Sequence, residues 1–225
     1  NWYEMVKYKG IPKNVKGDGR NAASFTLDTD FAKRLIHGYY ACVSYTDAQI
    51  GKVLRTLDEL GLSDDTIVVF TSDHGFSLME HNRWSKHNLF NVENRVPLMI
   101  RVPGLTQKAR SNSFVELIDL YPTIAELVGL EAPERVEGTS LVQNLKDPSL
   151  ISKSVGHARI WNGDMVVSPN YLYAEWRGEE GGNVYDNMLY DLKADSLEMN
   201  NIADQPKYRK LVDSLSQQIK FKTVQ

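Results

Sequence analysis

The residues of this chain that could do chemistry gather in one loop between two apolar segments. Asp73 and His74 directly follow the first segment, and Lys86 lies later in the same loop. Carboxylate oxygens are preferred ligands of Ca²⁺ and Mg²⁺, whereas an imidazole suits Zn²⁺ or adds one nitrogen to a mixed site. Two adjacent ligands are too few for any of these metals. We therefore expect a metal at Asp73 and His74 to need further carboxylates from residues outside this chain.

Lys86 is the second candidate, because a cationic side chain near that carboxylate could bind a sulfate or phosphate oxygen and offset charge on a leaving group. A solvated surface lysine is the alternative interpretation. His81 and His87 lie in the same loop and could act as acids, bases or ligands, although loop histidines are more often hydrogen-bonded structural residues. The density of ionisable residues in this loop is unusual for a plain connection.

Other reactive or aromatic side chains have simpler structural interpretations. Cys42 lies among apolar neighbours in a predicted helix, so we expect a core residue and not a nucleophile. His157 lies on a predicted strand and could point toward a cleft, a question that the sequence leaves open. Four aromatic residues of the C-terminal part are expected to form the core of a small sheet: Trp161, Tyr171, Tyr173 and Trp176.

Two strands must position the loop. Residues 66–71 and 96–102 are short apolar runs rich in β-branched residues, a pattern typical of strands buried on both faces in a parallel sheet covered by helices. Ligands of open α/β sheets bind beyond the carboxyl ends of the strands, where the Asp-His pair stands. A long amphipathic helix predicted at residues 30–60, closed by Gly61, leads into the first strand. Such an αβ unit needs other parallel strands to bury it.

The rest of the chain is predicted to form a second helix, a small sheet and a terminal helix. Pro122 lies inside the helix expected at residues 115–128 and should divide it into two short pieces or bend it. Short segments separated by turn residues predict an antiparallel sheet, followed by an amphipathic helix at residues 204–220. The expected strands are residues 155–160, 171–176 and 188–192.

Composition and charge exclude several classes of function. The 225 residues carry a formal net charge of -3 with intermixed signs, so no basic face supports nucleic-acid binding. No apolar run approaches the ~20 residues that span a bilayer, and the first residues do not form a secretion signal. One cysteine cannot form an internal disulfide. We expect two domains, at residues 1–150 and 151–225, with an irregular segment at residues 1–27.

Several motifs taken together resemble one enzyme family. SDHG at residues 72–75, EH at 80–81, WSK at 84–86 and RVPLMIRVPG at 95–104 form an ordered set that resembles the C-terminal half of sulfatases, members of the alkaline-phosphatase superfamily. The branch that contains iduronate-2-sulfatase is the most similar. The helix and strand before SDHG, and the later segments VELIDLYPTIAELVGL and LYDLKADSLEMNNIAD, also resemble that family.

The resemblance implies an α/β fold: the C-terminal part of a large mixed sheet flanked by helices, followed by a small antiparallel sheet with a terminal helix. It implies that Asp73 and His74 are two ligands of a single Ca²⁺, and that Lys86 contacts the sulfate and helps to stabilise the leaving oxygen. The expected substrate-binding residues are Lys86, His81 and Trp84. Residues 1–150 would be the C-terminal portion of the catalytic domain, with 151–225 as a small α+β subdomain.

Sulfatases attack the sulfate ester with a formylglycine made from a Cys/Ser-x-Pro/Ala-x-Arg motif. This motif is absent here, as is the pair of N-terminal aspartates that would complete the metal site. The resemblance therefore implies that the N-terminal half of the same protein is the partner of this chain and supplies the nucleophile and the remaining Ca²⁺ ligands. It also implies an exported location: periplasmic, lysosomal or secreted.

The expected activity is removal of sulfate from a sulfated sugar, such as a 2-O-sulfated uronate of a glycosaminoglycan or another polysaccharide. Met79 stands where many relatives have Gly, and residues 165–170 lack an Arg often found at the start of a late strand, so the substrate preference stays open. Two alternatives are a phosphodiesterase or phosphonate hydrolase of the same superfamily, and a catalytically silent binding protein with this fold.

Overall fold

The computed structural model describes residues 29–178 and 182–219, so the irregular segment expected at residues 1–27 lies outside the described residues. Contacts divide the described chain into two compact units. The first contains residues 29–87 and 95–104, and the second contains residues 88–94, 105–178 and 182–219. The domain boundary expected near residue 150 stays a prediction.

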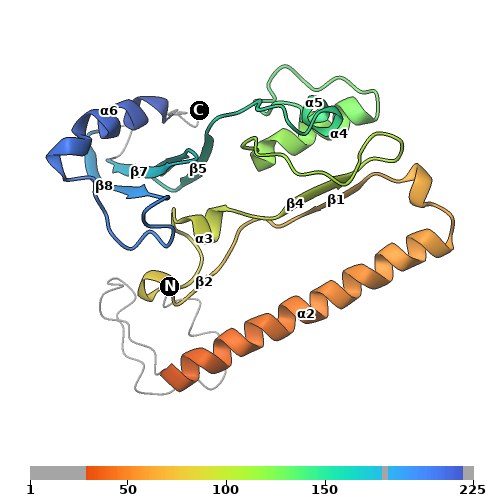
Figure 1. The fold of residues 1–225 in the computed structure, drawn as a ribbon, viewed down its shortest axis with the longest axis horizontal. Helices are drawn as coiled ribbons and strands as arrows, with labels where there is room; N and C mark the ends of the chain where they lie inside the picture. The colour runs from red at the N-terminus through yellow and green to blue at the C-terminus, as the bar shows by residue number, and fades with distance from the viewer. Residues whose placement is uncertain (1–28, 179–181, 220–225) are drawn as a thin grey trace. The chain divides into compact units, whose positions relative to one another are not determined.

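The first unit begins with the long helix that the sequence predicts. Helix α2 spans Thr29–Glu59 and is the orange helix of Figure 1. It ends because Gly61 adopts the left-handed conformation, with a φ of 67°. The N–H of Leu62 then donates to the Leu57 carbonyl and the N–H of Gly61 to the Asp58 carbonyl, both at 3.0 Å, which satisfies the last carbonyls of the helix. The helix and its glycine stop are confirmed.

Two strands follow at the predicted places, β1 at Val68–Thr71 and β4 at Leu98–Arg101. They pair with each other in antiparallel register, with Val69 opposite Ile100 (Figure 1). The expectation of parallel strands buried on both faces is wrong for this pair, because Met99 is 61% exposed and β1 carries no fully buried residue. A continuous apolar run indicates a strand from the interior of a sheet, but it does not fix the direction of the neighbouring strand.

A small hairpin occupies the loop between these strands. Strand β2 (Ser77–Leu78) pairs with β3 (Trp84–Ser85), and one 3₁₀ turn, η3 (Glu80–Asn82), connects them. Trp84 packs with Phe31 and Ala32 of α2 in a buried cluster. The hairpin is therefore fastened to the beginning of the long helix.

Most of α2 beyond its first turns is uncovered in the part of the chain that the structure describes. The fully buried residues of the helix are Phe31 and Ala32, whereas Val43 and Val53 are 51% and 69% exposed. Cys42 is also exposed, so the expectation of a core cysteine is wrong. The physical reason is that helical periodicity identifies an apolar face without showing what covers it.

The second unit is built on a four-stranded antiparallel sheet with the order β5-β6-β7-β8. Its strands are β5 (Gly156–Ile160), β6 (Gly163–Val167), β7 (Tyr171–Arg177) and β8 (Val184–Asp191). The predicted small sheet is confirmed, but β6 was missed. A turn of only two residues, Trp161 and Asn162, separates β5 from β6, and the Asn162-Gly163 turn signal in the sequence was overlooked.

The aromatic residues of this sheet differ in their burial. Tyr173 is buried at 1% exposure, and Tyr171 and Trp176 are partly buried against the core. Trp161 is 75% exposed, so its assignment to the core is wrong. It lies in the turn between β5 and β6 with a φ of 51°, and a turn residue points away from both faces of a sheet.

Short helices complete the second unit. They are α3 (Asn91–Asn94), α4 (Leu120–Leu127), α5 (Val142–Lys146) and α6 (Arg209–Gln218), with 3₁₀ turns η4 (Leu117–Asp119) before α4 and η6 (Pro206–Tyr208) before α6. Pro122 stands in the first turn of α4, where its missing N–H has no intrahelical partner to lose. The helix expected at residues 115–128 begins instead as the 3₁₀ turn η4 and continues directly as α4, so Pro122 does not break it near Tyr121. Leu215 and Ile219, at the end of the chain's last helix, pack against Tyr173 of the sheet.

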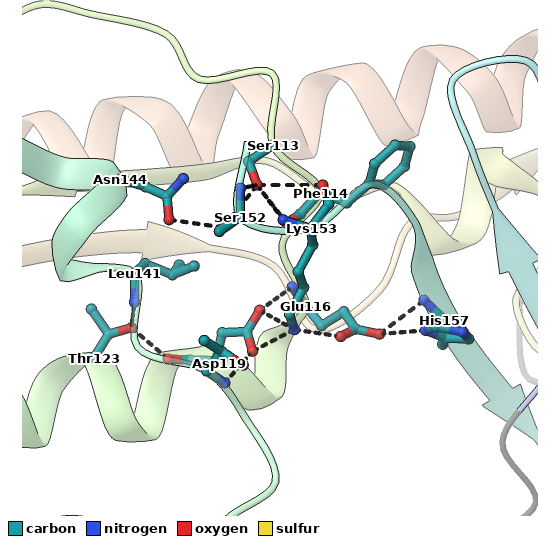
Figure 2. Close-up of polar contacts among 11 residues, drawn as sticks. Ser113, Phe114, Glu116, Asp119, Thr123, Leu141, Asn144, Ser152, Lys153 and His157 are labelled. Carbon is teal, nitrogen blue, oxygen red and sulfur yellow. Dashed lines mark hydrogen bonds and ion pairs between the residues drawn. The ribbon is translucent and has the colours of Figure 1, made fainter. Parts of the chain in front are cut away.

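A buried polar network joins η4 to the segment that enters β5, as Figure 2 shows. Lys153 Nζ lies 2.6 Å from Glu116 Oε2 and 2.7 Å from Asp119 Oδ1. Asp119 is fully buried and also accepts the N–H groups of Glu116 and Thr139, at 2.9 and 2.8 Å. The backbone N–H of His157 donates to Glu116 at 2.9 Å. His157, whose role the sequence leaves open, is thus part of this network.

None of the helices in residues 29–178 and 182–219 has the length and apolar character needed to cross a membrane.

Candidate functional site

The Asp-His pair stands where the sequence places it, two and three residues after strand β1. Thr71 closes the strand and its hydroxyl donates to the Pro97 carbonyl at 3.0 Å, which ties the strand end to the chain before β4. The Ser72 hydroxyl donates to the His74 carbonyl at 2.9 Å and bends the backbone into a turn. The carboxylate of Asp73 is 83% exposed, so it is open to a ligand.

The hydrogen bonds of His74 decide which ring nitrogen keeps a free electron pair. Nδ1 lies 2.8 Å from the Gly75 carbonyl oxygen, an atom that only accepts, so Nδ1 carries the proton. In the neutral ring Nε2 is then an acceptor. It lies 2.8 Å from Lys86 Nζ and 3.3 Å from Asp73 Oδ2. The structure thus brings together the three residues that the sequence selects, and fixes the tautomer in which Nε2 can bind a cation.

Charge at this site is set by the same contacts. The backbone N–H of His74 donates to the Asp73 carboxylate at 3.0 Å and is the main cause that lowers the pKa of Asp73, with electrostatic interactions with His74 and Lys86 acting in the same direction. A carboxylate and an imidazole nitrogen form a donor pair that fits a divalent metal. Among the described residues no group of three or more His, Cys, Asp or Glu side chains could hold a metal ion. Ligation of a metal ion by Asp73 and His74 stays a prediction.

The backbone of the loop is strained to an extent that the sequence does not reveal. Five residues other than Gly have positive φ between residues 79 and 87: Met79 at 93°, His81 at 54°, Asn82 at 55°, Ser85 at 87° and His87 at 82°. Each such conformation costs on the order of 1 kcal/mol and persists only where surrounding contacts impose it, which is common at functional sites. Met79, which stands where many relatives have Gly, was the one signal of this strain in the sequence.

The other predicted substrate-binding residues lie in the hairpin. His81 is half-buried in the turn η3. Trp84 is only 3% exposed, and its ring meets the edge of Phe76 with centroids 5.9 Å apart and an angle of 85°. Contact of His81 and Trp84 with a substrate stays a prediction. The sequence did not single out Phe76, because one aromatic residue after a polar turn forms no recognisable pattern with the residues around it.

Comparison with known families decides what kind of protein carries this site. Residues 7–130, more than half of the chain, match the family model described as Sulfatase. The chain belongs to the sulfatase family. The matched residues include the complete loop with Asp73, His74 and Lys86, so the resemblance that the motifs indicate is confirmed.

Curated sulfatases are similar over most of this chain. Arylsulfatase K of Bos taurus is 32% identical over 195 residues, which cover 81% of this chain and 35% of that protein. Iduronate 2-sulfatase of Mus musculus is 30% identical over 261 residues, which cover 84% of this chain and 47% of that protein. The chain thus spans between a third and a half of the length of these two relatives.

Solved structures show the same fold. A protein in complex with its substrate D-glucosamine-2-N,6-O-disulfate has a TM-score of 0.75 and 25% identity, covering 96% of this chain and 43% of its own. A phosphonate monoester hydrolase from Silicibacter pomeroyi has a TM-score of 0.78 and 25% identity, covering 89% and 44%. These likenesses confirm the predicted α/β class: part of an alkaline-phosphatase-like mixed sheet with helices, plus a small antiparallel sheet and a terminal helix.

Proposed function

We propose that the whole protein is a sulfuric ester hydrolase that removes sulfate from a sulfated sugar, and that this chain supplies Asp73, His74 and Lys86 to its active site. One observation carries the proposal: Lys86 Nζ and Asp73 Oδ2 both converge on His74 Nε2, at 2.8 and 3.3 Å, in a strained loop of a sulfatase. A cation, an anion and an imidazole held this close suit the binding of a metal together with an anionic group.

Asp73 and His74 would hold one Ca²⁺, with the remaining ligands and a formylglycine nucleophile contributed by residues outside this chain. When bound, the ion would neutralise charge on the sulfate oxygens, and the formylglycine would supply the attacking group. Because Nδ1 is bonded to the Gly75 carbonyl, Nε2 is the His74 nitrogen that would bind the ion. Asp73 contributes the negative charge that a hard cation requires.

Lys86 would act on the substrate itself. Its ammonium group can donate to a sulfate oxygen and to the oxygen that leaves with the sugar, and so offset the negative charge that develops there. In the chain alone the ammonium lies 2.8 Å from His74 Nε2, and it would turn to the sulfate once an ion occupied that nitrogen. His81, in the neighbouring turn, would contribute a further polar contact to the sugar.

The substrate class that we propose is a 2-O-sulfated uronate of a glycosaminoglycan or related polysaccharide. The name of the mouse relative, iduronate 2-sulfatase, supports the 2-O position, and the substrate of the solved neighbour supports sulfated sugars more widely. The location implied by the family resemblance, exported or lysosomal, stays a prediction.

Phosphonate ester hydrolysis is the second candidate, because a phosphonate monoester hydrolase matches the fold with a TM-score of 0.78. Both chemistries place a tetrahedral anion beside a metal and a lysine. The nucleophile, which we expect from residues outside this chain, would separate them.

The test uses the full-length protein and compares three substrates at equal concentration: an unsaturated disaccharide with a 2-O-sulfated uronate, glucosamine 6-O-sulfate and a phenyl phosphonate monoester. We expect the 2-O-sulfated disaccharide to give the highest kcat/KM, and peptide mass spectrometry to find the aldehyde form of a cysteine or serine. The highest kcat/KM with the phosphonate would favour the second candidate. Turnover of none of the three, with no aldehyde, would favour the silent binding protein.

The metal assignment has its own test. Asp73→Asn keeps the size of the side chain but removes its charge, so we expect the affinity for Ca²⁺ to fall by at least about tenfold in isothermal titration calorimetry. Asp64→Asn is the matched control, because Asp64 is an exposed residue of the turn η2 (Ser63–Asp65) in the same unit. Equal Ca²⁺ affinity of the two variants would remove Asp73 from the metal site.

A further inference from the structure

The hairpin between β1 and β4 sets where Lys86 stands relative to His74. In the β2–β3 pair Ser77 lies opposite Ser85, and Leu78 lies opposite Trp84. His74 precedes the first arm of the hairpin, and Lys86 directly follows the second arm. Two residue pairs are too few to make a hairpin stable in water. Contacts other than the ladder must therefore hold the two arms together.

A series of aromatic rings supplies those contacts. The Phe76 ring, on the first arm, meets the Trp84 ring, on the second arm, with centroids 5.9 Å apart in an edge-to-face arrangement. Tyr39 of α2 lies against Phe76, with centroids 5.4 Å apart. Trp84 is 3% exposed in the cluster with Phe31 and Ala32. The rings therefore attach both arms to one rigid helix, in an arrangement that aromatic pairs prefer.

The backbone on either side of Lys86 shows what these contacts must resist. Ser85 and His87 both have positive φ, 87° and 82°. Residues with a Cβ leave this region unless their surroundings impose it. Ser85 is 1% exposed and follows the buried Trp84 directly, so the burial of Trp84 keeps this strained peptide in place.

We propose that Trp84 and Phe76 are positioning residues that keep Lys86 beside His74, with its ammonium next to the proposed metal ligands. The 2.8 Å contact joins His74, before the first arm of the hairpin, to Lys86, after the second arm. The contact between the Phe76 and Trp84 rings joins the same two segments on the side of α2. Trp84 then acts through Lys86 instead of touching the sugar, which differs from the substrate contact expected from the sequence. The catalytic consequence rests on the proposed function, but the positioning itself does not.

The two halves of the site would respond differently to loss of the rings. Asp73 and His74 are tied to the end of β1 by bonds from Thr71 to Pro97 and from Ser72 to His74, which do not involve the rings. Lys86 directly follows β3, which pairs with β2 through only two residue pairs. Loosening the rings should therefore displace Lys86 and leave the metal ligands in place. A displacement of about 1 Å can lower turnover by roughly 10²-fold.

The first experiment measures positioning without any enzymatic assay. Acetic anhydride is applied to the full-length protein after Ca²⁺ is removed with a chelator, and the acetylation rate of Lys86 is compared by mass spectrometry with that of the exposed Lys108. We expect Lys86 to react about tenfold more slowly than Lys108 in the natural protein, because its amine is engaged with His74. Trp84→Leu should remove most of that difference, whereas Trp84→Phe, which keeps an aromatic edge, should retain it. Trp161→Leu, at an exposed tryptophan, is the matched control and should change nothing.

The second experiment measures turnover. Trp84→Leu should lower kcat for the sulfated disaccharide by about 10–100-fold, with KM and Ca²⁺ affinity changed by less than about threefold, and Trp84→Phe should recover most of the loss. If Trp84→Leu and Trp84→Phe only lost folded protein, the active fraction of each would fall according to its stability. The apparent kcat and the amount of Ca²⁺ bound would then fall together. Absence of activity in the natural protein would overturn the proposed function, and the acetylation rates would still decide the positioning.

Phe76→Leu keeps Trp84 in the core and provides the same test if Trp84→Leu does not fold. It removes the ring that bridges Tyr39 and Trp84, so Lys86 should again approach the acetylation rate of Lys108. Slow acetylation of Lys86 in folded Trp84→Leu, or in Phe76→Leu, would overturn the positioning role. Lys86 that reacts as fast as Lys108 in the natural protein would overturn it as well.

Discussion

Two clusters of charged residues in this chain contain similar side chains and differ in how completely the chain satisfies them. In the network of the second unit, both carboxylate oxygens of the fully buried Asp119 accept the Lys153 ammonium, at 2.7 and 2.8 Å. At the candidate site Asp73 is 83% exposed and faces a histidine nitrogen that is itself an acceptor. The first cluster is buried and complete without a ligand, whereas the second leaves the Asp73 carboxylate exposed beside His74 and Lys86, where a metal ion would stabilise it.

The backbone shows the same difference. Glu116 and Asp119 form a capping box at the start of η4, a regular way to satisfy the first N–H groups of a helix. The loop of Lys86 holds five positive-φ residues other than Gly. A buried and fully paired cluster on regular backbone stabilises the fold, and an exposed cluster beside strained backbone is suited to bind a ligand. Four predictions test this contrast, from the largest expected effect to the smallest.

Lys153→Met should be the most destabilising of these changes. It leaves the carboxylate of Asp119 buried without its cation, and breaking a buried pair in this way costs about 3–5 kcal/mol in the free energy of unfolding. The measurement is urea denaturation of the full-length protein, with Lys146→Met as the control, because Lys146 is exposed at the end of α5. A loss below about 1 kcal/mol would show that the network does not stabilise the fold.

Lys86→Ala should show the opposite profile, with a large loss of activity and little loss of stability. We expect kcat to fall by about 10²–10³-fold, because the group that offsets leaving-group charge is gone. The free energy of unfolding should change by less than about 1 kcal/mol, since the lysine is half-buried and holds no buried carboxylate. Lys108→Ala controls for the loss of one exposed positive charge. Unchanged turnover in Lys86→Ala would remove this residue from the mechanism.

Acid should weaken the buried polar network of the second unit, because it protonates Glu116. Burial by itself would raise the pKa of this carboxyl, but hydrogen bonds from His157 and Lys153 outweigh it and lower the pKa to about 2 from 4.5. A carboxyl with a lowered pKa stabilises the fold above its ordinary pKa, and the contribution is lost as the pH falls from about 4.5 to about 2. The loss amounts to roughly 3 kcal/mol over that window.

Urea denaturation at a series of pH values checks this prediction by comparing the natural protein with Glu116→Gln. The difference in stability between the two should shrink as the pH falls through the window. A difference that stays constant from neutral pH to pH 3 would mean that another group causes the acid sensitivity.

The sequence predicted the elements of this fold better than their pairing. The hydrophobic pattern predicts helix α2 and the positions of β1 and β4. Gly61 predicts the end of α2, because glycine readily adopts the left-handed conformation. The antiparallel pairing of β1 with β4 does not, because strand direction depends on which segments meet in space. Cys42 shows the same limit: its apolar neighbours predict a buried face, and only the tertiary structure shows what covers it.

The sequence predicted which residues of the candidate site could do chemistry, but it did not predict the contacts and the backbone conformation that position them. Asp73, His74 and Lys86 are recognisable as ligands and as a cation from residue type and order alone, and the structure brings all three together. The aromatic pair of Phe76 and Trp84 was not predictable, because a contact between rings depends on the path of the loop. The backbone strain was also not predictable, since residue types such as Met and Ser do not indicate a positive φ.

Met79 offers the smallest effect and the most direct measure of that strain. Its φ of 93° lies in the left-handed region, and its side chain packs on the Trp84 cluster. Met79→Gly and Met79→Ala lose the same packing, but only Gly relieves the backbone, so the Gly variant should be more stable by about 1 kcal/mol. At Ser214, an exposed position within α6, the order should reverse, with the Gly variant less stable than the Ala variant by about 1 kcal/mol. If Ala is better at both positions, the loop is not strained at Met79, and the contrast between the two clusters would rest on their charges alone.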